Sequence, residues 1–477
     1  MIKLSKMHKR LLALSAVLPM GSAVAQTAAT EPQLETVVVT AQRRAENIKD
    51  VPVSVTMLKD ERLDVLLSGG QDIRVLASKV PSLNIESSNG RTFPRFYIRG
   101  YGNTDFNAFA SQPVSLVYDD VVQENGILKG FPMFDLAGVE VLRGPQGTLF
   151  GRNTPAGVVK FESAKPTLDK VEGYYSLSWA THNTVNLEGA ANVPLSNEWA
   201  MRVSTLRQHR DDFVDNTFTG AKDSLEGYNE HAERVQFLYK PSTTFNALFN
   251  VHSRSTTGSA RLFRANLIGR GTNGFAPGTD LDSLVSNALN GQDLKTQGAN
   301  MRLSWDLGAV KLYSITGYET VNHYNSRGDI DGGVPGQTGV PFQVQTASRM
   351  TDLKQYSQEF RVESKNAGPL NWQAGLYYFD EDATGGSDNF NNAQQQTSRV
   401  VSNQKNKAWA AFGSVNYTVS DDLTVRGGIR YTDDKKDFNT LEHTNVTLIG
   451  PAGVSESKSK VSWDLSGTYK LNRDVNA

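Results

Sequence analysis

Few residues in this chain have the types and spacing that catalytic or metal-binding chemistry requires. The seven histidines are scattered, and none forms the H-E-x-x-H pattern of a zinc site. The sequence has no cysteine, which excludes thiolate nucleophiles and disulfide scaffolds, and it has no G-x-S-x-G turn. Asp329–Gly332 matches only part of a calcium loop, so we interpret it as a solvated loop. We predict a protein that is not an enzyme and has no metal site and no cofactor.

A second set of residues has the chemistry of recognition rather than reaction. Three polar stretches, Ser87–Pro94, Gly102–Pro113 and Gln123–Phe131, lie between strand-like runs and carry phenylalanine and arginine. Loops usually present the contacts of a scaffold, and rings beside guanidinium groups suit a small polar ligand. Ordinary packing explains each ring equally well. The candidate ligand contacts are Arg91, Phe93, Arg95, Phe106, Phe109 and Phe131.

The elements that position these residues begin after a targeting segment. Basic residues between Lys3 and Arg10 precede the mostly apolar run Leu11–Met20, and Ala23-Val24-Ala25 has the small-residue pattern of a cleavage site. These features predict a secretory signal peptide over residues 1–25. The alternative is an anchor helix, but Pro19 and Gly21 interrupt the apolar run, which is too short to span a membrane.

The segment from residue 26 to 47 is polar apart from one run of high β-propensity. Glu35, Thr36, Val37, Val38, Val39 and Thr40 have no partner strand beside them in the sequence. Such a run could add as a strand to the sheet edge of another protein. The alternative is that it forms the first strand of the domain that follows.

Residues 48–166 predict one compact α/β domain. Strand-like runs occur at Val53–Thr56, Phe96–Arg99, Val114–Tyr118 and Val139–Leu142, and Asp60–Ser68 has apolar residues at helical spacing. A second short helix fits residues 73–77.

From about residue 167 the sequence pattern changes to repeated segments in which polar and apolar residues alternate. Met301–Leu307 places apolar side chains on one face and polar ones on the other, and Phe245–Val251 does nearly the same. The polar face includes Arg302, Arg426 and Arg430, which indicates that this face lines a water-filled interior. Residues 167–477 therefore predict a transmembrane β-barrel with short turns at one end and long loops, such as Arg254–Gly298 and Asn322–Thr351, at the other. A large soluble β-protein is the alternative.

One long motif resembles a known family. Residues 139–159, VEVLRGPQGTLFGRNTPAGVV, resemble the plug signature of TonB-dependent outer-membrane receptors, and residues 98–102, IRGYG, resemble a second element of the same plug. Residues 37–41 resemble the TonB box, and Arg430-Tyr431-Thr432 resembles a barrel strand. The signature residues that match are Arg99, Gly100, Glu140, Arg143, Gly144, Pro145, Gly147, Gly151, Asn153 and Gly157.

The resemblance implies an N-terminal plug inside a barrel of about 22 strands. It implies active import of a scarce nutrient across the outer membrane, by default a ferric siderophore, with energy from TonB, ExbB and ExbD. The candidate contacts could then meet a catecholate, an anionic iron chelate or a sugar, so a glycan or other nutrient stays an alternative. We expect a monomer in outer-membrane lipid. The formal net charge of -1 gives no basis for nucleic-acid binding.

Two rival functions are less favoured. A signalling transducer of this family has an extra folded domain before the TonB box, and the stretch between Gln26 and Leu34 is too short for one. A passive porin would have its pore obstructed by the plug.

Two features bear on how the plug is held. Arg99 and Arg143 would be enclosed by the barrel, where an unpaired guanidinium is costly. We predict that inward carboxylates, Glu359 above all, pair with them; the alternative is pairing within the plug. The run Tyr118-Asp119-Asp120-Val121 stands where many members have a glycine turn, and residues 160–163 also depart from the family pattern.

The length is short for this family. The residues after about Lys170 suffice for about 12 to 14 strands. A plug of about 120 residues has a diameter of about 35 Å, whereas 14 strands enclose about 28 Å and 22 strands about 44 Å. We therefore expect a C-terminally truncated receptor with an incomplete barrel and open strand edges, and a non-functional fragment is one alternative for its role.

Overall fold

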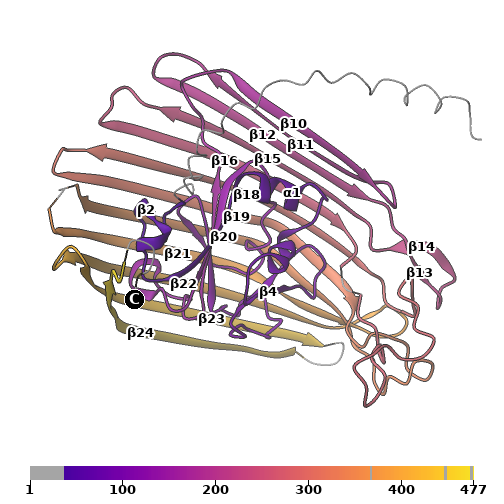
Figure 1. Ribbon diagram of the computed structural model, residues 1–477. Helices are drawn as coiled ribbons and strands as arrows, with labels where there is room; N and C mark the ends of the chain where they lie inside the picture. Colours follow the sequence, from indigo (N-terminus) through magenta and orange to yellow (C-terminus); the bar gives the residue numbers. More distant parts are fainter. Residues whose placement is uncertain (1–36, 261, 366–367, 445–447, 473–475, 477) are drawn as a thin grey trace, which may run out of the picture. The chain divides into compact units, whose positions relative to one another are not determined.

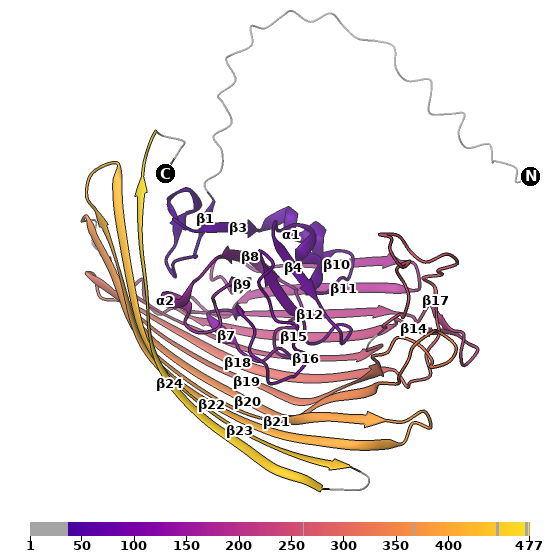
Figure 2. The ribbon, with the colours of Figure 1, turned by 90° about the horizontal axis from the view of Figure 1, so that it is seen from below.

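The computed structural model describes residues 37–477 except 261, 366–367, 445–447, 473–475 and 477. The predicted signal peptide and the box residues Glu35 and Thr36 lie outside the described residues. From Val38 onward the chain forms one compact unit, in which a small α/β domain lies against the concave face of a large curved sheet (Figures 1 and 2).

The small domain, which we call the plug, is built on a five-stranded sheet of order β3-β8-β9-β6-β7. Strands β6 and β9 are parallel and the other neighbours are antiparallel. A two-stranded β1-β2 pair and a β4-β5 pair flank this sheet. Its elements are β1 (Val38–Val39), β2 (Glu46–Asn47), η2 (Ile48–Asp50), β3 (Ser54–Leu58), α1 (Asp60–Leu67), η3 (Ile73–Ser78), β4 (Leu83–Glu86), β5 (Arg95–Ile98), β6 (Val114–Tyr118), β7 (Val121–Gln123), β8 (Leu136–Arg143), α2 (Gly147–Phe150) and β9 (Gly157–Ser163).

The plug has its own apolar core. Every residue of β6 is buried, as expected for a strand covered on both faces. Leu63 of α1 and Leu76 of η3 pack with Val141 of β8 and Phe161 of β9 in one cluster. The segment predicted as a second helix forms the 3₁₀ helix η3.

The large sheet contains twelve antiparallel strands within the described part of the chain, each hydrogen-bonded to the next in sequence apart from small insertions. A three-stranded sheet, β14-β13-β17, lies in the long loops. The strands of both are β10 (Glu172–Ala180), β11 (Thr184–Pro194), β12 (Trp199–Arg210), β13 (Val214–Asn216), β14 (Ala221–Leu225), β15 (Tyr228–Tyr239), β16 (Phe245–Gly258), β17 (Ser283–Leu284), β18 (Gly291–Asp306), β19 (Val310–Asp329), β20 (Gln345–Ser364), β21 (Leu370–Phe390), β22 (Gln396–Thr418), β23 (Leu423–Thr444) and β24 (Leu448–Tyr469).

The predicted fold class, a plug plus an incomplete barrel of about 12 to 14 strands, is confirmed. Among the described residues β10 and β24 are the two edges of the sheet and do not pair with each other. No described helix has both the length and the apolar character needed to cross a membrane.

The long loops are shorter than predicted because the strands continue into polar sequence. β16 extends to Gly258 and β18 begins at Gly291, so only the middle of the predicted loop Arg254–Gly298 is loop. Likewise, β19 and β20 take half of the predicted loop Asn322–Thr351. The strands remain hydrogen-bonded there although their outer face is no longer apolar. A prediction based on hydropathy therefore ended these strands too early.

The outer face of β21–β23 shows where the apolar part stops. Exposed Tyr378, Trp409 and Tyr431 lie on neighbouring strands, and Trp409 packs against Tyr431 with ring centroids 5.3 Å apart. Two residues further along, Asp380 pairs with Lys407 on the adjacent strand at 3.3 Å. We call this charged row, with Asp382–Lys405 beyond it, the charged collar. The aromatic row below it has the position of an interfacial belt.

The turn that replaces the family's glycine bend is intact. Asp119 and Asp120 both have positive φ, 46° and 68°, and aspartate tolerates this region better than most residues. The Asp119 carboxylate accepts hydrogen bonds from Ser163 N and Oγ, and Asp120 lies 3.2 Å from the Arg302 guanidinium. Burial opposes ionisation of Asp120, but Arg302 and Lys160 outweigh it and hold the pKa well below its ordinary range.

Candidate functional site

The box segment runs into the interface between the plug and the large sheet. Val38 and Val39 pair with Asn47 and Glu46, which leaves Val38 half exposed and Val39 buried. Thr40 donates hydrogen bonds from N and Oγ1 to Glu140 Oε1, both at 2.8 Å. The described end of the predicted box is thus tied to β8 of the plug.

The residues just after the box are tied to the sheet. Arg43 Nη1 lies 3.0 Å from both carboxylate oxygens of Glu359 on β20, and both side chains are buried. Arg44 Nη2 donates to the carbonyls of Ser364 and Trp372, at 2.7 and 3.0 Å, across the short turn between β20 and β21. This cluster stands at the short-turn end of the sheet.

The predicted partners of Glu359 are therefore corrected. Glu359 is the buried sheet carboxylate that was expected, but it takes Arg43, with Arg361 beside it at 3.3 Å, and not Arg99 or Arg143. Arg143 instead donates to Ser54 Oγ and Thr56 Oγ1 on the adjacent plug strand. Partial burial, and then Arg99, lower the pKa of Arg143. The hydrogen bonds of Arg143 are thus made to the neighbouring plug strand β3 and not to the large sheet.

The predicted signature forms the end of β8, the short helix α2 and the start of β9. Gly151 has φ +82°, and a Cβ there would come within 2.9 Å of the Arg430 guanidinium on β23. Gly157 has φ +152°, and its Cβ would lie 2.2 Å from the Leu142 carbonyl oxygen. Close approach of the backbone requires glycine at 157, whereas the left-handed φ favours glycine at 151. Of the other signature positions, Gly147 begins α2 and Glu140 lies on β8. Gly144, Pro145 and Asn153 lie in the loops on either side of α2, and Arg99 and Gly100 form the turn after β5.

Two carboxylates at contacts between the plug and the sheet were not predicted: Asp135, which is buried, and Asp434, which is partly buried. Asp135 of the plug lies 2.5 Å from Arg202 and 3.2 Å from Arg234, arginines of β12 and β15. Arg152, in the turn that follows α2, lies 2.7 Å from Asp434 on β23. The only sequence signal for these contacts was that arginines recur on the inward face of the alternating strands.

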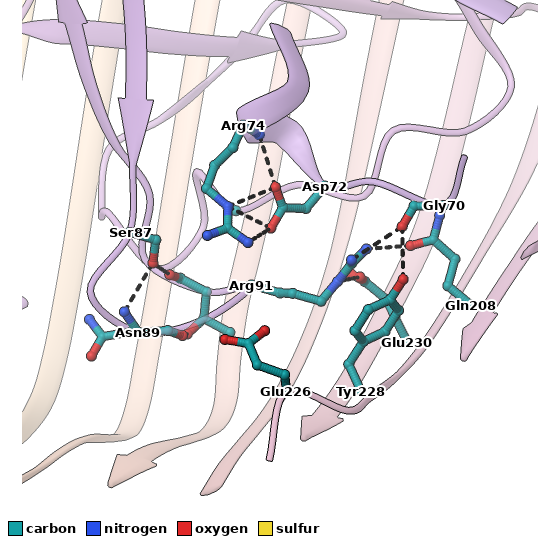
Figure 3. A network of polar contacts seen from close by, with 12 residues as sticks. Gly70, Asp72, Arg74, Ser87, Asn89, Arg91, Gln208, Glu226, Tyr228 and Glu230 are labelled. Carbon is teal, nitrogen blue, oxygen red and sulfur yellow. Dashed lines mark hydrogen bonds and ion pairs between the residues drawn. The ribbon is translucent and has the colours of Figure 1, made fainter. Parts of the chain in front are cut away.

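The same pattern repeats at the long-loop end of the plug around Arg91 (Figure 3). Arg91 Nε lies 2.6 Å from Glu230 of β15, and its guanidinium also contacts Gln208 and stacks 4.1 Å over the Tyr228 ring. Arg254 of β16 shares Glu230 at 2.7 Å. Arg91, a candidate ligand contact, is therefore buried in a structural network.

The other candidate contacts divide into two groups. Phe93 is buried in an apolar cluster with the sheet, and Phe131 packs on Tyr118 with centroids 3.9 Å apart. Phe106 is 54% exposed and Phe109 is partly buried with its ring near that of Phe438. Arg95 lies beneath Phe106, 4.3 Å from its centroid.

Phe106 and Phe109 line a cavity at the long-loop end. This aromatic cavity has a volume of about 310 Å³ and is bounded by Phe106, Phe109, Phe263 and the upper parts of β20–β22. A larger cavity of about 840 Å³ adjoins it, because Ser88 and Phe263 line both. The first is small for a ligand site, but the two together have the size of one.

Comparison with known proteins agrees with this architecture. The model described as TonB-dependent Receptor Plug Domain matches residues 47–158, and that described as TonB dependent receptor-like, beta-barrel, matches residues 242–477. The pesticin receptor of Yersinia pestis is 29% identical over 229 residues, which are 46% of this chain and 32% of that receptor. The ferrioxamine receptor of Yersinia enterocolitica is 27% identical over 118 residues, 25% of this chain and 16% of that receptor.

Solved structures share the fold over most of the chain. The ferric yersiniabactin uptake receptor FyuA from Yersinia pestis superposes with a TM-score of 0.74 at 19% identity, covering 88% of this chain and 62% of that one. The ferric-catecholate import receptor Fiu from E. coli K12 gives 0.68 at 15% identity, covering 92% and 71%. The match to the curated pesticin receptor spans about a third of that receptor's length. With its plug and its barrel sheet, this chain belongs to the TonB-dependent receptor family of the outer membrane.

Proposed function

We propose that this protein takes part in TonB-dependent active import of a nutrient across the outer membrane, with a ferric siderophore as the default substrate. The observation that carries the proposal is the position of the plug. It separates an aromatic cavity at the long-loop end from the box segment at the short-turn end. In a closed barrel, as the family resemblance implies, a substrate bound in the cavity would pass only if the plug moved or rearranged.

The domain limits that go with this proposal are a signal peptide at 1–25, a TonB-box segment at 26–47, a plug at 48–166 and barrel strands at 167–477. The partners would be TonB, with ExbB and ExbD, and outer-membrane lipid around a monomer. The relatives' names support iron chelates as the substrate class, since they include a ferrioxamine receptor and a ferric yersiniabactin receptor. A glycan receptor, an inactive fragment, a transducer and a porin are the competing roles.

The box mechanism needs main-chain hydrogen bonds more than particular side chains. Glu35–Thr40 would add as a strand to the sheet edge of TonB, and a pull would then act on Thr40 and Arg43. The contacts Thr40–Glu140 and Arg43–Glu359 are polar, so water can replace them as the segment leaves. The pull would reach the plug through β8 and the wall through β20.

Energy-dependent uptake into cells that express the chain tests the proposal. Val38→Pro removes one backbone donor and restricts Val37, so uptake should fall to the level of cells without TonB. Val38→Thr keeps the donor and the β-branched shape and serves as the matched control. Uptake that survives Val38→Pro, or that is unchanged without TonB, would refute the box assignment or the transport role respectively.

A further inference from the structure

The aromatic cavity is uncharged. Its lining consists of aromatic and aliphatic side chains together with hydroxyl and amide groups, and no Lys, Arg, Asp or Glu is among the described residues that line it. The larger apolar members are Phe106, Phe109, Phe263, Ile330 and Val400. An anion placed there would lose hydration without gaining a cationic partner.

Three arginines near the cavity already have carboxylate partners. Arg95 lies beneath Phe106 and pairs with Glu86 at 3.0 Å. Arg349 and Arg399, beside the strand positions that line the cavity, share Asp388 at 3.4 and 3.0 Å. Drawing any of these guanidinium groups toward an anionic ligand would break an existing ion pair.

The adjoining larger cavity also offers no excess of positive charge. Three arginines and three carboxylates line it: Arg74, Arg91, Arg210, Asp72, Glu86 and Glu226. Most of these groups are engaged in ion pairs, including Arg74 with Asp72 at 2.7 Å and Arg210 with Glu226 at 3.1 Å. Figure 3 shows Arg74 turned onto Asp72 and Arg91 onto Glu230.

We propose that the substrate is an uncharged molecule with flat apolar faces and several hydrogen-bonding groups. Among iron chelates, this is a neutral tris-hydroxamate complex, in which three hydroxamate anions balance Fe³⁺, rather than a tris-catecholate complex with three negative charges. The phenylalanine rings supply contact area, and the serine, threonine and asparagine groups supply hydrogen bonds. An uncharged oligosaccharide has the same chemistry. The inference rests on the proposed import function, because it names the substrate of that cavity.

Equilibrium binding to the purified chain in detergent tests this directly, with three probes: a neutral ferric tris-hydroxamate, a trianionic ferric tris-catecholate and a neutral oligosaccharide. The neutral chelate should bind at least tenfold more tightly than the trianion. Phe109→Ser should weaken neutral binding about tenfold, and Val400→Lys should raise binding of the trianion. Phe218→Ser, at an exposed aromatic outside both cavities, is the control and should change neither.

The outcomes separate the inference from the import proposal. Tighter binding of the trianion overturns the uncharged-substrate inference but leaves iron import standing. Binding of the oligosaccharide without either chelate supports the inference and removes the siderophore as the substrate. If no probe binds while circular dichroism shows an intact β-fold, or if Phe109→Ser has no effect, the cavity assignment is wrong.

Discussion

The interior of the plug and its contact with the large sheet are held by different interactions. Inside the plug, Leu76, Leu116 and Val159 are fully buried in one apolar cluster. Against the sheet, the contacts are largely ion pairs such as Arg43–Glu359 and Arg91–Glu230, with small apolar clusters between them. Apolar burial is lost to water at a high cost, whereas water can take over polar contacts. The difference predicts a plug that can separate from the wall while it stays folded.

The chain is well suited to testing this difference. All six tryptophans lie on strands of the large sheet, and the plug has none. Since no cysteine is present, Lys79→Cys at an exposed plug position provides one unique dye site. Energy transfer from tryptophan to the dye then reports separation of plug and sheet, and proteolysis reports unfolding of the plug.

The largest effect should come from breaking the plug core. Leu116→Asp places a charge at a position that is 0% exposed, and it should destabilise the plug by about 4 kcal/mol or more. We expect rapid proteolysis of the plug with the sheet tryptophan signal retained. Val65→Asp on the exposed face of α1 is the control. A plug that stays protease-resistant in Leu116→Asp would show that the core is not what holds it.

A smaller effect should follow from breaking the interface. Glu230→Gln leaves Arg91 and Arg254 without their carboxylate, at a cost of about 3 kcal/mol. Energy transfer should fall at a lower urea concentration than in the parent, with the plug still protease-resistant. Glu226→Gln breaks the partly exposed ion pair with Arg210. It should lower the free energy of separation by less than about 1 kcal/mol and so move the urea midpoint less. Equal shifts in the two variants would contradict the importance of burial.

Acid should separate the interface before it unfolds the core. Burial opposes ionisation of Asp135, but hydrogen bonds from Arg202 and the charge of Arg234 outweigh it and lower the pKa. A carboxyl whose folded pKa is lowered gives stability that is present above its unfolded pKa and is lost as pH falls through the folded pKa. Energy transfer should therefore persist at pH 5 and be lost below about pH 4. Asp135→Asn should flatten this loss; a transition between pH 5 and 7 would point to other groups.

The smallest effect concerns a buried lysine of the plug. Burial lowers the pKa of Lys129 to about 8, with Glu124 and Glu381 opposing the shift, and its amino group donates to the Val114 carbonyl. Because the folded pKa is below the unfolded one, plug stability should rise as pH increases from 8 to 10.5. Lys129→Met should remove this slope in urea titrations and stabilise the plug by about 1 kcal/mol at pH 7. A slope unchanged in that variant would assign it to another group.

Sequence patterns predicted the elements that depend on local periodicity. The helix at Asp60–Leu67 and the strands β6 and β8 follow from apolar spacing, and alternation predicted the large sheet. The glycine-rich signature predicted the plug because close approaches, as at Gly157, tolerate no side chain.

Contacts between distant elements were not predictable in the same way. The alternation of polar and apolar residues indicates that Glu359 and Arg234 face inward. It does not tell which plug residue reaches them, because that depends on their height along the barrel and on the orientation of the plug. Arg43 and Glu359 are 316 residues apart, so their pairing depends on the strand register and the plug orientation together. The predicted strand ends were wrong for a related reason. Backbone hydrogen bonding of β21 continues beyond Tyr378, where the outer face is no longer apolar and the sequence pattern gives no signal.

Under the proposed import function, the charged collar bears on the distance over which a substrate would travel. It places the outer limit of the hydrocarbon layer between Tyr378 and Asp380 on β21, whereas Ser387 and Asn389, which line the aromatic cavity, are further along the same strand. At about 3.4 Å per residue and a tilt of about 40°, the cavity stands roughly 20 Å outside the membrane. With an apolar band of about 25 Å beneath it, the proposed import would be a descent of roughly 45 Å, and almost half of that path would lie outside the lipid.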